Sequence, residues 1–506
     1  MKKGKTSLNL ITNLIAFVIN MIISFKLTPY VSENLGNEAY GFITLANSVI
    51  SYFTVVSMAL NAYASRFICL HFFKGDYEES KKYYSSVLFS NIILVMALLI
   101  ILGPFLYNIT FFFKISPNLI TDVRILFITV FMNYFITLLA VTYTVAPIIN
   151  NRLDIDAIKN IINCVLKAVL ICAGFIFLGK YVWIVGAATL VCSAVCFTIN
   201  FVYHFVSVKQ LRFGFKYISI KHTVTVLKSG IWASVGSLGN VLNSGLDMWV
   251  TNRYLDGNSM GYIAIGATLL NLLVGLTSTL NTIFWPKTLE AYSQNRKEDV
   301  LNYISKSSRL QVMLSSMVFA GFTTIGKDFL RLWVPQQDED VLYVVVWLGV
   351  LTYTLASITK PIGLAFTLTN RLKLNAVFNI LMGFMNITAM LLLLQFSSLG
   401  VYAVSLTSAV PGILYCMIFV PIASTLYLKC KVSRWYKESA KAVVICLAMT
   451  VIFGFLSKLY ISDSWLLFFA KVALLGIVGL VINFFVLLTK DDRSEILNKV
   501  LHRKKA

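Results

Sequence analysis

The stretch NRLDIDAIKNII, residues 151–162, returns as NRLKLNAVFNIL at residues 370–381. Six of the twelve positions are identical and four more are conservative, at an offset of 219 residues. Charged and amide side chains in so short a run could form a binding site, or they could mark a duplicated chain. The recurrence of the offset elsewhere in the chain separates these two interpretations.

The same offset relates several other parts of the chain. Gly41-Phe42-Ile43 corresponds to Gly261-Tyr262-Ile263 at an offset of 220, and Val182-Trp183 corresponds to Val401-Tyr402 at 219. Further pairs at 220 are Asn61 and Asn281, Glu78 and Glu298, Glu79 and Asp299, and Tyr83 and Tyr303. We therefore predict an internal duplication. The stretch at 151–162 is then a turn between two spans, with Arg152 setting orientation and Asp154 or Asp156 capping the next helix.

The composition indicates an all-α polytopic membrane protein. Of 506 residues, 58% are hydrophobic and 13% are charged, whereas soluble domains carry about 25% charged residues. The mean hydropathy is +0.78. Apolar runs of about 20 residues, enough to cross a hydrocarbon core of ~30 Å, recur throughout. We predict fourteen transmembrane helices, at 8–30, 39–64, 83–107, 121–149, 155–178, 181–206, 226–250, 260–285, 308–334, 341–369, 374–395, 398–428, 441–461 and 465–489.

The distribution of basic residues predicts the orientation. One alternating set of gaps between the spans holds 32 of the 43 Lys and Arg residues, and the other set holds seven. Because basic residues concentrate in cytoplasmic loops, both termini are expected in the cytoplasm. The same rule accounts for the net charge of +21, so no nucleic-acid partner is predicted.

The duplication predicts two parallel six-helix repeats followed by two additional helices. An even number of spans in each repeat makes both enter the membrane from the same side, and rocking one lobe against the other would give alternating access. The expected parts are an N-terminal lobe (1–206), a basic linker (207–225), a C-terminal lobe (226–428), two additional helices (429–489) and a basic tail (490–506).

A short motif after the first span carries a family resemblance. It reads LG-x-x-x-YG, with Leu35, Gly36, Tyr40 and Gly41, and the later stretch 229–265 is SGIWASVGSLGNVLNSGLDMWVTNRYLDGNSMGYIAI. Together with fourteen spans and duplicated lobes, these features resemble the polysaccharide-exporter branch of the multidrug/oligosaccharidyl-lipid/polysaccharide (MOP) superfamily, over nearly the whole chain.

That resemblance implies a Wzx-type flippase of the bacterial cytoplasmic membrane. It would turn undecaprenyl-diphosphate-linked oligosaccharide, such as an O-antigen or capsule repeat unit, from the inner to the outer leaflet. Membrane lipids and a glycan polymerase machinery are its candidate partners, and H⁺ or Na⁺ is a candidate coupling ion.

Three alternatives stay open. Drug exporters of the superfamily usually have twelve spans with an acid in the first, and lipid II flippases typically carry an Arg-Asp pair there, whereas this first span has Lys26 and no acid. A membrane glycan-assembly enzyme would usually need a large extramembrane loop, and no gap is long enough. The chain has no Walker A sequence, metal-spaced His/Cys cluster or serine nucleophile elbow. No cofactor, metal or enzymatic activity is expected.

Charges inside the spans are the candidate substrate-binding residues. Each costs about 2.5–3.5 kcal/mol near the bilayer centre, so each needs a reason to be there. Lys26 and Lys360 could offset the desolvation of a diphosphate. Asp247 lies beside Leu246, the position equivalent to Lys26, so we hypothesise that Lys26 and Asp247 face one cleft and pair without substrate.

Other polar residues are weaker candidates. Arg66, Arg253 and Lys287, at the ends of spans, are as well explained by interfacial anchoring. Lys471 is expected to snorkel towards the membrane surface. Several amides are expected either to bond across helices or to line a wet cleft: Asn13, Asn20, Asn47, Asn240, Asn243 and Asn271.

Overall fold

The computed structural model describes residues 3–150, 152, 154–369, 371–458, 464–490 and 492–494. These residues form helices joined by short turns, and no strand occurs among them. The chain divides into two compact units. Unit 1 comprises Met1–Ala264 and Ala376–Thr388, and unit 2 comprises Ile265–Asn375 and Ala389–Ala506.

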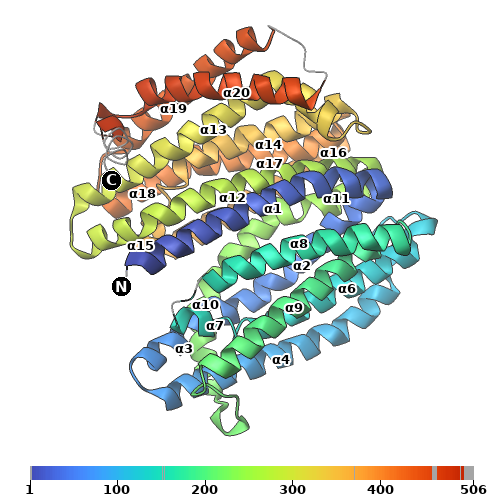
Figure 1. Ribbon diagram of the computed structural model, residues 1–506, viewed down its shortest axis with the longest axis vertical. Helices are drawn as coiled ribbons and strands as arrows, with labels where there is room; N and C mark the ends of the chain where they lie inside the picture. Colours follow the sequence, from blue (N-terminus) through green and yellow to red (C-terminus); the bar gives the residue numbers. More distant parts are fainter. Residues whose placement is uncertain are drawn as a thin grey trace. The chain divides into compact units, whose positions relative to one another are not determined.

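Unit 1 is a bundle of long helices. In Figure 1, α6 and α9 run side by side, as do α1 and α8, and α10 packs along α2. Its α-helices are α1 (Lys3–Leu35), α2 (Asn37–Asn61), α3 (Ala64–Phe73), α4 (Tyr77–Tyr107), α5 (Ile109–Phe112), α6 (Ile120–Ala140), α7 (Val145–Ile149), α8 (Asp154–Phe177), α9 (Trp183–Ser207), α10 (Ile220–Asn240) and α11 (Asp247–Tyr254). A π-helical segment, η3 (Val241–Gly245), joins α10 to α11.

Unit 2 is built around the 37-residue helix α13, which packs against α14, α19 and α20. Helices α12 and α16 belong partly to each unit, since α12 crosses the boundary after Ala264 and α16 contributes Ala376–Thr388 to unit 1. The α-helices are α12 (Gly257–Ser293), α13 (Lys297–Trp333), α14 (Glu339–Thr359), α15 (Leu364–Leu368), α16 (Leu372–Phe396), α17 (Val401–Leu414), α18 (Val420–Leu428), α19 (Val432–Ser457) and α20 (Trp465–Ile482). Two π-helical segments are η4 (Tyr415–Phe419) and η5 (Asn483–Leu487).

Twelve helices in the described part of the chain are long and apolar enough to cross a membrane. The prediction of an all-helical, multi-pass membrane protein is thus confirmed, but the predicted spans at 226–250 and 308–334 are not among the twelve. The first is divided by η3 into α10 and α11. The second lies in α13, whose inward face buries several serines and therefore has low hydropathy.

Helix boundaries recur along the chain at nearly the offset of the sequence repeat. Helices α2 and α12 begin at Asn37 and Gly257, and α4 and α13 begin at Tyr77 and Lys297. The break that separates α6 from α7 covers residues 141–144, and the break between α14 and α15 covers residues 360–363. Equivalent stretches of sequence therefore start and interrupt helices at equivalent positions.

The glycines of the LG-x-x-x-YG motif lie at a close helix crossing. A Cβ on Gly41 of α2 would stand 2.6 Å from the Cβ of Met260 in α12, and a Cβ on its counterpart Gly261 would stand 2.6 Å from that of Asn37. Gly36, which precedes α2, has a positive φ of 81°, where glycine carries no steric penalty. The motif thus sets a turn and a backbone approach, both within unit 1.

At the turn that opens the quoted stretch, Arg152 bonds the carboxylate of Asp154. Asn151, Leu153 and Asn370 lie outside the described residues. Arg152 donates from Nε to Oδ1 of Asp154 (2.9 Å) and from Nη2 to Oδ2 (2.9 Å). Asp154 begins α8. The stretch therefore starts a helix at a turn, as predicted.

Lys471 is a correction to the sequence interpretation. Instead of snorkelling to the surface, its side chain is buried in unit 2, and its Nζ lies 3.3 Å from Oδ2 of Asp328 in α13. Asp328 also accepts a hydrogen bond from Arg331 at 2.9 Å. A partner on the neighbouring helix makes burial less costly than extension, which sequence position alone could not indicate.

We expect the variant Asp328→Ala to destabilise unit 2 by about 2 kcal/mol, because it leaves the buried Lys471 ammonium without this carboxylate. The double variant Asp328→Leu/Lys471→Met should recover most of that loss. Lys327→Ala breaks the neighbouring exposed pair with Asp340 and should change stability by less than about 0.5 kcal/mol. Thermal unfolding of the purified protein measures all three, and equal effects of Asp328→Ala and Lys327→Ala would contradict the expectation.

Candidate functional site

Lys26 lies on the exposed side of α1, in unit 1. Its exposed neighbours at helical spacing are Val18 and Ile22, and Pro29 follows within one turn. Among the residues that the structure describes, none forms a hydrogen bond or ion pair with Lys26. The side chain is therefore an uncompensated cation within the apolar span Ile15–Leu35.

Asp247 begins α11 and is separated by one residue from the end of the π-helical segment η3. The segment is held from α2, where the Tyr52 hydroxyl donates to the carbonyl oxygen of Gly245 at 2.8 Å. Asp247 is partly buried and interacts electrostatically with Tyr52. The hypothesised Lys26–Asp247 ion pair is not formed among the described residues of unit 1, although both residues belong to it.

Lys360 lies where α14 stops, in unit 2. Its own N–H still bonds the carbonyl of Ala356 (2.8 Å), but Pro361 has no N–H and the helix is interrupted before Leu364. The neighbouring Thr359 and Ile362 are each 1% exposed, whereas the Lys360 side chain is exposed. The interruption thus presents one cation from an otherwise buried turn.

The three weaker candidates are all exposed. Arg66 is in α3, with its guanidinium carbon 5.9 Å from the ring centroid of Tyr63. Arg253 lies in the last turn of α11, and Lys287 lies on α12. Unit 1 thus holds Lys26, Asp247, Arg66 and Arg253, whereas unit 2 holds Lys287 and Lys360. That the six line one cleft stays a prediction.

An amide network joins η3 and α10 to α16, within unit 1. The Asn243 amide donates to the carbonyl oxygen (2.9 Å) and Oδ1 (3.0 Å) of Asn379, and the Asn379 amide donates to Oδ1 of Asn240 (2.9 Å). Farther along α16, the Asn386 amide donates to the carbonyl oxygen of Asn243 at 2.6 Å. For Asn240 and Asn243, the structure therefore shows the cross-helix bonding that was one of the two predicted roles.

Sequence reasoning missed the partners of this network, Asn379 and Asn386. The available signal was Asn379 itself, because it lies in the repeated stretch at 370–381 and matches Asn160 of the first copy. The other predicted amides behave differently. Asn47 donates to the Ile43 carbonyl of its own helix, and Asn20 accepts from Ser24 one turn away. The side chain of Asn13 lies outside the described residues.

Replacing Asn379 with Leu is expected to lower thermal stability by about 1 kcal/mol, since cross-helix amide bonds in membranes contribute that much or less. Asn47→Leu is the matched control, because that amide bonds only within its own helix among the described residues. The two purified variants would be compared by thermal unfolding. Equal midpoints would show that the network adds no stability.

The described residues contain no group of three His, Cys, Asp or Glu side chains that could hold a metal ion. The functional groups of the candidate residues are ammonium and guanidinium cations, one carboxylate and amides. Such groups can bind and orient an anion.

Comparison with known proteins places the chain in a family. A family model described as polysaccharide biosynthesis protein matches residues 8–286, more than half of the chain. The uncharacterized membrane protein EpsK of Bacillus subtilis (strain 168) is 25% identical over 499 residues, covering 98% of each chain.

Solved structures share the fold. The lipid II flippase MurJ, in an inward closed conformation, aligns with a TM-score of 0.71 at 17% identity, over 98% of this chain and 99% of its own. An inward-facing multidrug resistance MATE family transporter of the MOP superfamily aligns with a TM-score of 0.64 at 14% identity, over 85% and 99%. The resemblance to the polysaccharide-exporter branch of the MOP superfamily is confirmed. The chain belongs to the polysaccharide biosynthesis protein family.

Proposed function

We propose that this protein flips polyprenyl-diphosphate-linked oligosaccharide from the inner to the outer leaflet of a bacterial cytoplasmic membrane. The observation that carries the proposal is a pair of exposed lysines: Lys26 lies within the apolar span Ile15–Leu35, and Lys360 lies in the turn directly after the apolar span Glu339–Thr359. A cation facing lipid there would cost about 2.5–3.5 kcal/mol. A water-filled path for an anionic headgroup removes that cost and gives both side chains a ligand.

The headgroup chemistry fits these residues. A diphosphate that crosses the hydrocarbon core loses its hydration, and two fixed ammonium groups replace part of it at low dielectric. The sugars need hydrogen bonds, which exposed amides such as Asn20 and Asn47 can supply. Asp247, which is partly buried in the same unit as Lys26, is the candidate carboxylate for a coupling H⁺ or Na⁺.

The mechanism is alternating access between two parallel repeats. The recurring helix boundaries and the repeated breaks at 141–144 and 360–363 support an origin by duplication. In this proposal the lobes are 1–206 and 226–428, joined by the linker 207–225, with two further helices at 429–489 and the tail 490–506. Counting 226–250 and 308–334 as spans gives fourteen, with both termini in the cytoplasm.

A reconstituted assay tests the proposal. The full chain in proteoliposomes should move a fluorescent polyprenyl-diphosphate oligosaccharide from one leaflet to the other, read as loss of protection from an external glycosidase. Deleting the gene should cause the same class of lipid to accumulate on the cytoplasmic face. Transport of an organic cation instead of the glycolipid would support the multidrug alternative, and covalent extension of the glycan would support the enzyme. Either result would overturn the proposal.

Lipid II is a second candidate substrate, favoured by the likeness to the MurJ fold over 98% of the chain. Both lipids share the polyprenyl diphosphate, so the lysines do not distinguish them. Competition in the same assay does, since the preferred lipid should inhibit transport of the other at the lower concentration.

A further inference from the structure

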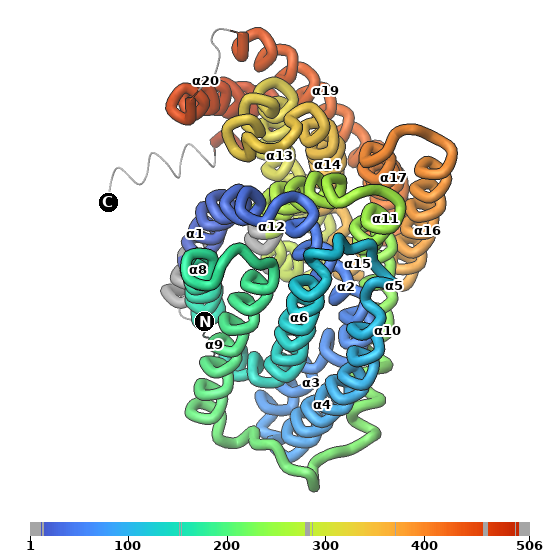
Figure 2. Tube along the Cα trace, turned by 90° about the vertical axis from the view of Figure 1, so that its right-hand side faces the viewer, coloured from blue at the N-terminus to red at the C-terminus, as the bar shows by residue number. Residues whose placement is uncertain are grey.

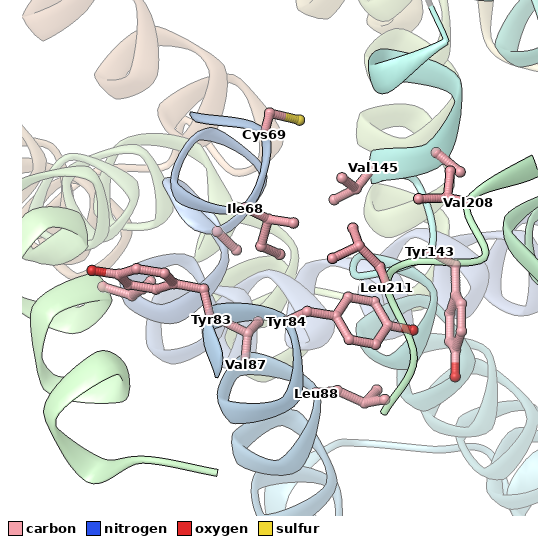
Figure 3. Close-up of a cluster of buried hydrophobic side chains, with 13 residues drawn as sticks. Ile68, Cys69, Tyr83, Tyr84, Val87, Leu88, Tyr143, Val145, Val208 and Leu211 are labelled. Atoms are coloured by element: carbon pink, nitrogen blue, oxygen red, sulfur yellow. The ribbon is translucent and has the colours of Figure 1, made fainter. Parts of the chain in front are cut away.

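The segment that joins α9 to α10, residues 208–219, is part of the predicted linker 207–225 and packs against one end of unit 1. It is called the linker below. Val208 and Leu211 are each 1% exposed and belong to a buried cluster with Tyr84 and Tyr143. Figure 3 shows these side chains together, with Leu211 lying beside Val145. Two apolar contacts in a stretch of twelve residues fix the linker to the helical bundle.

Polar contacts hold the rest of the linker. The carbonyl oxygen of Leu211 lies 2.8 Å from Nε2 of His204. The backbone N–H of Gly214 donates to the Ser85 hydroxyl (3.3 Å), and that of Ser219 donates to the Ser86 hydroxyl (2.9 Å). The linker is therefore a preformed surface and not a loose tether.

The outer side of this linker and the first turn of α10 combine exposed cations with exposed apolar side chains. Phe215 is 76% exposed and Ile220 is 81% exposed, and Arg212, Lys216 and Lys221 are exposed beside them. We call these five residues the linker surface. Figure 2 follows the chain from α9 through this linker into α10.

Neighbouring charges leave the linker surface basic. The start of α4 contributes Asp76, Glu78 and Glu79, beside Lys81 and Lys82. The Glu79 carboxylate is already paired with His222 (2.6 Å) and Lys82 (3.0 Å). The Nζ atoms of Lys216 and Lys81 lie 4.9 Å and 5.5 Å from the ring centroid of Tyr217, so both cations lie close to this ring.

We propose that the linker surface docks onto anionic phospholipid headgroups of the leaflet that it faces. Helix α9 is one of the apolar membrane helices and ends at Ser207, so the linker begins at a membrane boundary. Cations there are attracted to anionic lipid, and exposed aromatic and aliphatic side chains favour the interface. Because the linker is already held by these contacts to unit 1, little conformational entropy is lost on docking.

Hydrogen exchange of the full chain in nanodiscs tests this proposal. Backbone amides of residues 208–221 should exchange about 10-fold more slowly in discs with roughly 30% phosphatidylglycerol than in pure phosphatidylcholine. Raising the salt to ~0.5 M should remove the difference, because the exposed charges are then screened. Inorganic phosphate added to phosphatidylcholine discs should not reproduce the slowing, which distinguishes lipid headgroups from free phosphate.

Variants separate the basic residues from general charge effects. Arg212→Gln/Lys216→Gln should lose the dependence on phosphatidylglycerol, and Arg212→Lys/Lys216→Arg should keep it. The control Lys114→Gln/Lys180→Gln removes two exposed cations from other loops of unit 1 and should also keep it. Equal exchange of the wild type in both lipids would overturn the proposal, as would protection that survives Arg212→Gln/Lys216→Gln. Protection that needs an added protein would assign the surface to a protein partner instead.

Discussion

Replacing Lys360 with Gln is expected to lower the initial rate of glycolipid flipping by about 100-fold. A hydrogen bond to a charged group is worth up to ~3 kcal/mol, and each 1.4 kcal/mol is about tenfold in an equilibrium or rate. The turn at 360–363 presents this ammonium group while its neighbours are buried, so no adjacent side chain can replace it. The measurement is the glycosidase-protection assay in proteoliposomes, normalised to the amount of inserted protein.

Two control variants make this result specific. Lys360→Arg keeps the positive charge and should retain most of the transport. Lys458→Gln removes an exposed lysine at the end of α19 and should transport normally. Lys26→Gln is expected to behave like Lys360→Gln, because Lys26 is also an exposed cation and has no hydrogen bond or ion pair among the described residues. Wild-type rates for Lys26→Gln and Lys360→Gln would remove both residues from the mechanism.

The largest loss of stability is expected for Gly230→Ala, at about 3 kcal/mol, the upper end of what overpacking usually costs. A Cβ at Gly230 of α10 would lie 2.0 Å from the carbonyl oxygen of Ala59 and 2.8 Å from its carbonyl carbon. These are backbone atoms of α2, so they cannot rotate away as a side chain would. Helices α2 and α10 would have to separate, and their packing is a main contact of unit 1.

Gly236→Ala in the same helix is the matched control. A Cβ at Gly236 meets nothing within 4 Å, and alanine favours a helix by about 1 kcal/mol over glycine, so this variant should be neutral or slightly stabilising. Thermal unfolding of both purified proteins gives the comparison. Similar midpoints for the two variants would show that the approach of α10 to α2 is not close.

Several features were predictable because their physical cause is local. Apolar helices follow from apolar runs. The positions of Lys26 within such a run and of Lys360 beside Pro361 follow from counting along the chain. The turn at the quoted stretch was also predictable, because the stretch separates two apolar runs, whereas the pairing of Arg152 with Asp154 was seen only in the structure. The interruption at Lys360 was foreseeable because Pro361 removes a helical hydrogen bond.

Other features were missed because their cause lies on a distant helix. Lys471 is buried because Asp328, 143 residues earlier, lies 3.3 Å away. Asn379 bonds Asn240 and Asn243 across a similar separation. Helix α13 was predicted to contain a span at 308–334 but is not among the twelve apolar spans of the described residues. Several of its buried serines have partners inside unit 2, as where the Ser357 hydroxyl donates to that of Ser315 at 2.6 Å.

The sequence by itself determined the class of protein and most of its apolar helices, and it predicted the repeat, because hydropathy and a fixed offset are properties of residues along one chain. Only the tertiary structure decided which polar side chains bond to other helices. Asn243 and Lys471 have partners on other helices, whereas Lys26 has none among the described residues. A buried polar group is stable only when another element supplies its partner, and which element does so depends on three-dimensional packing.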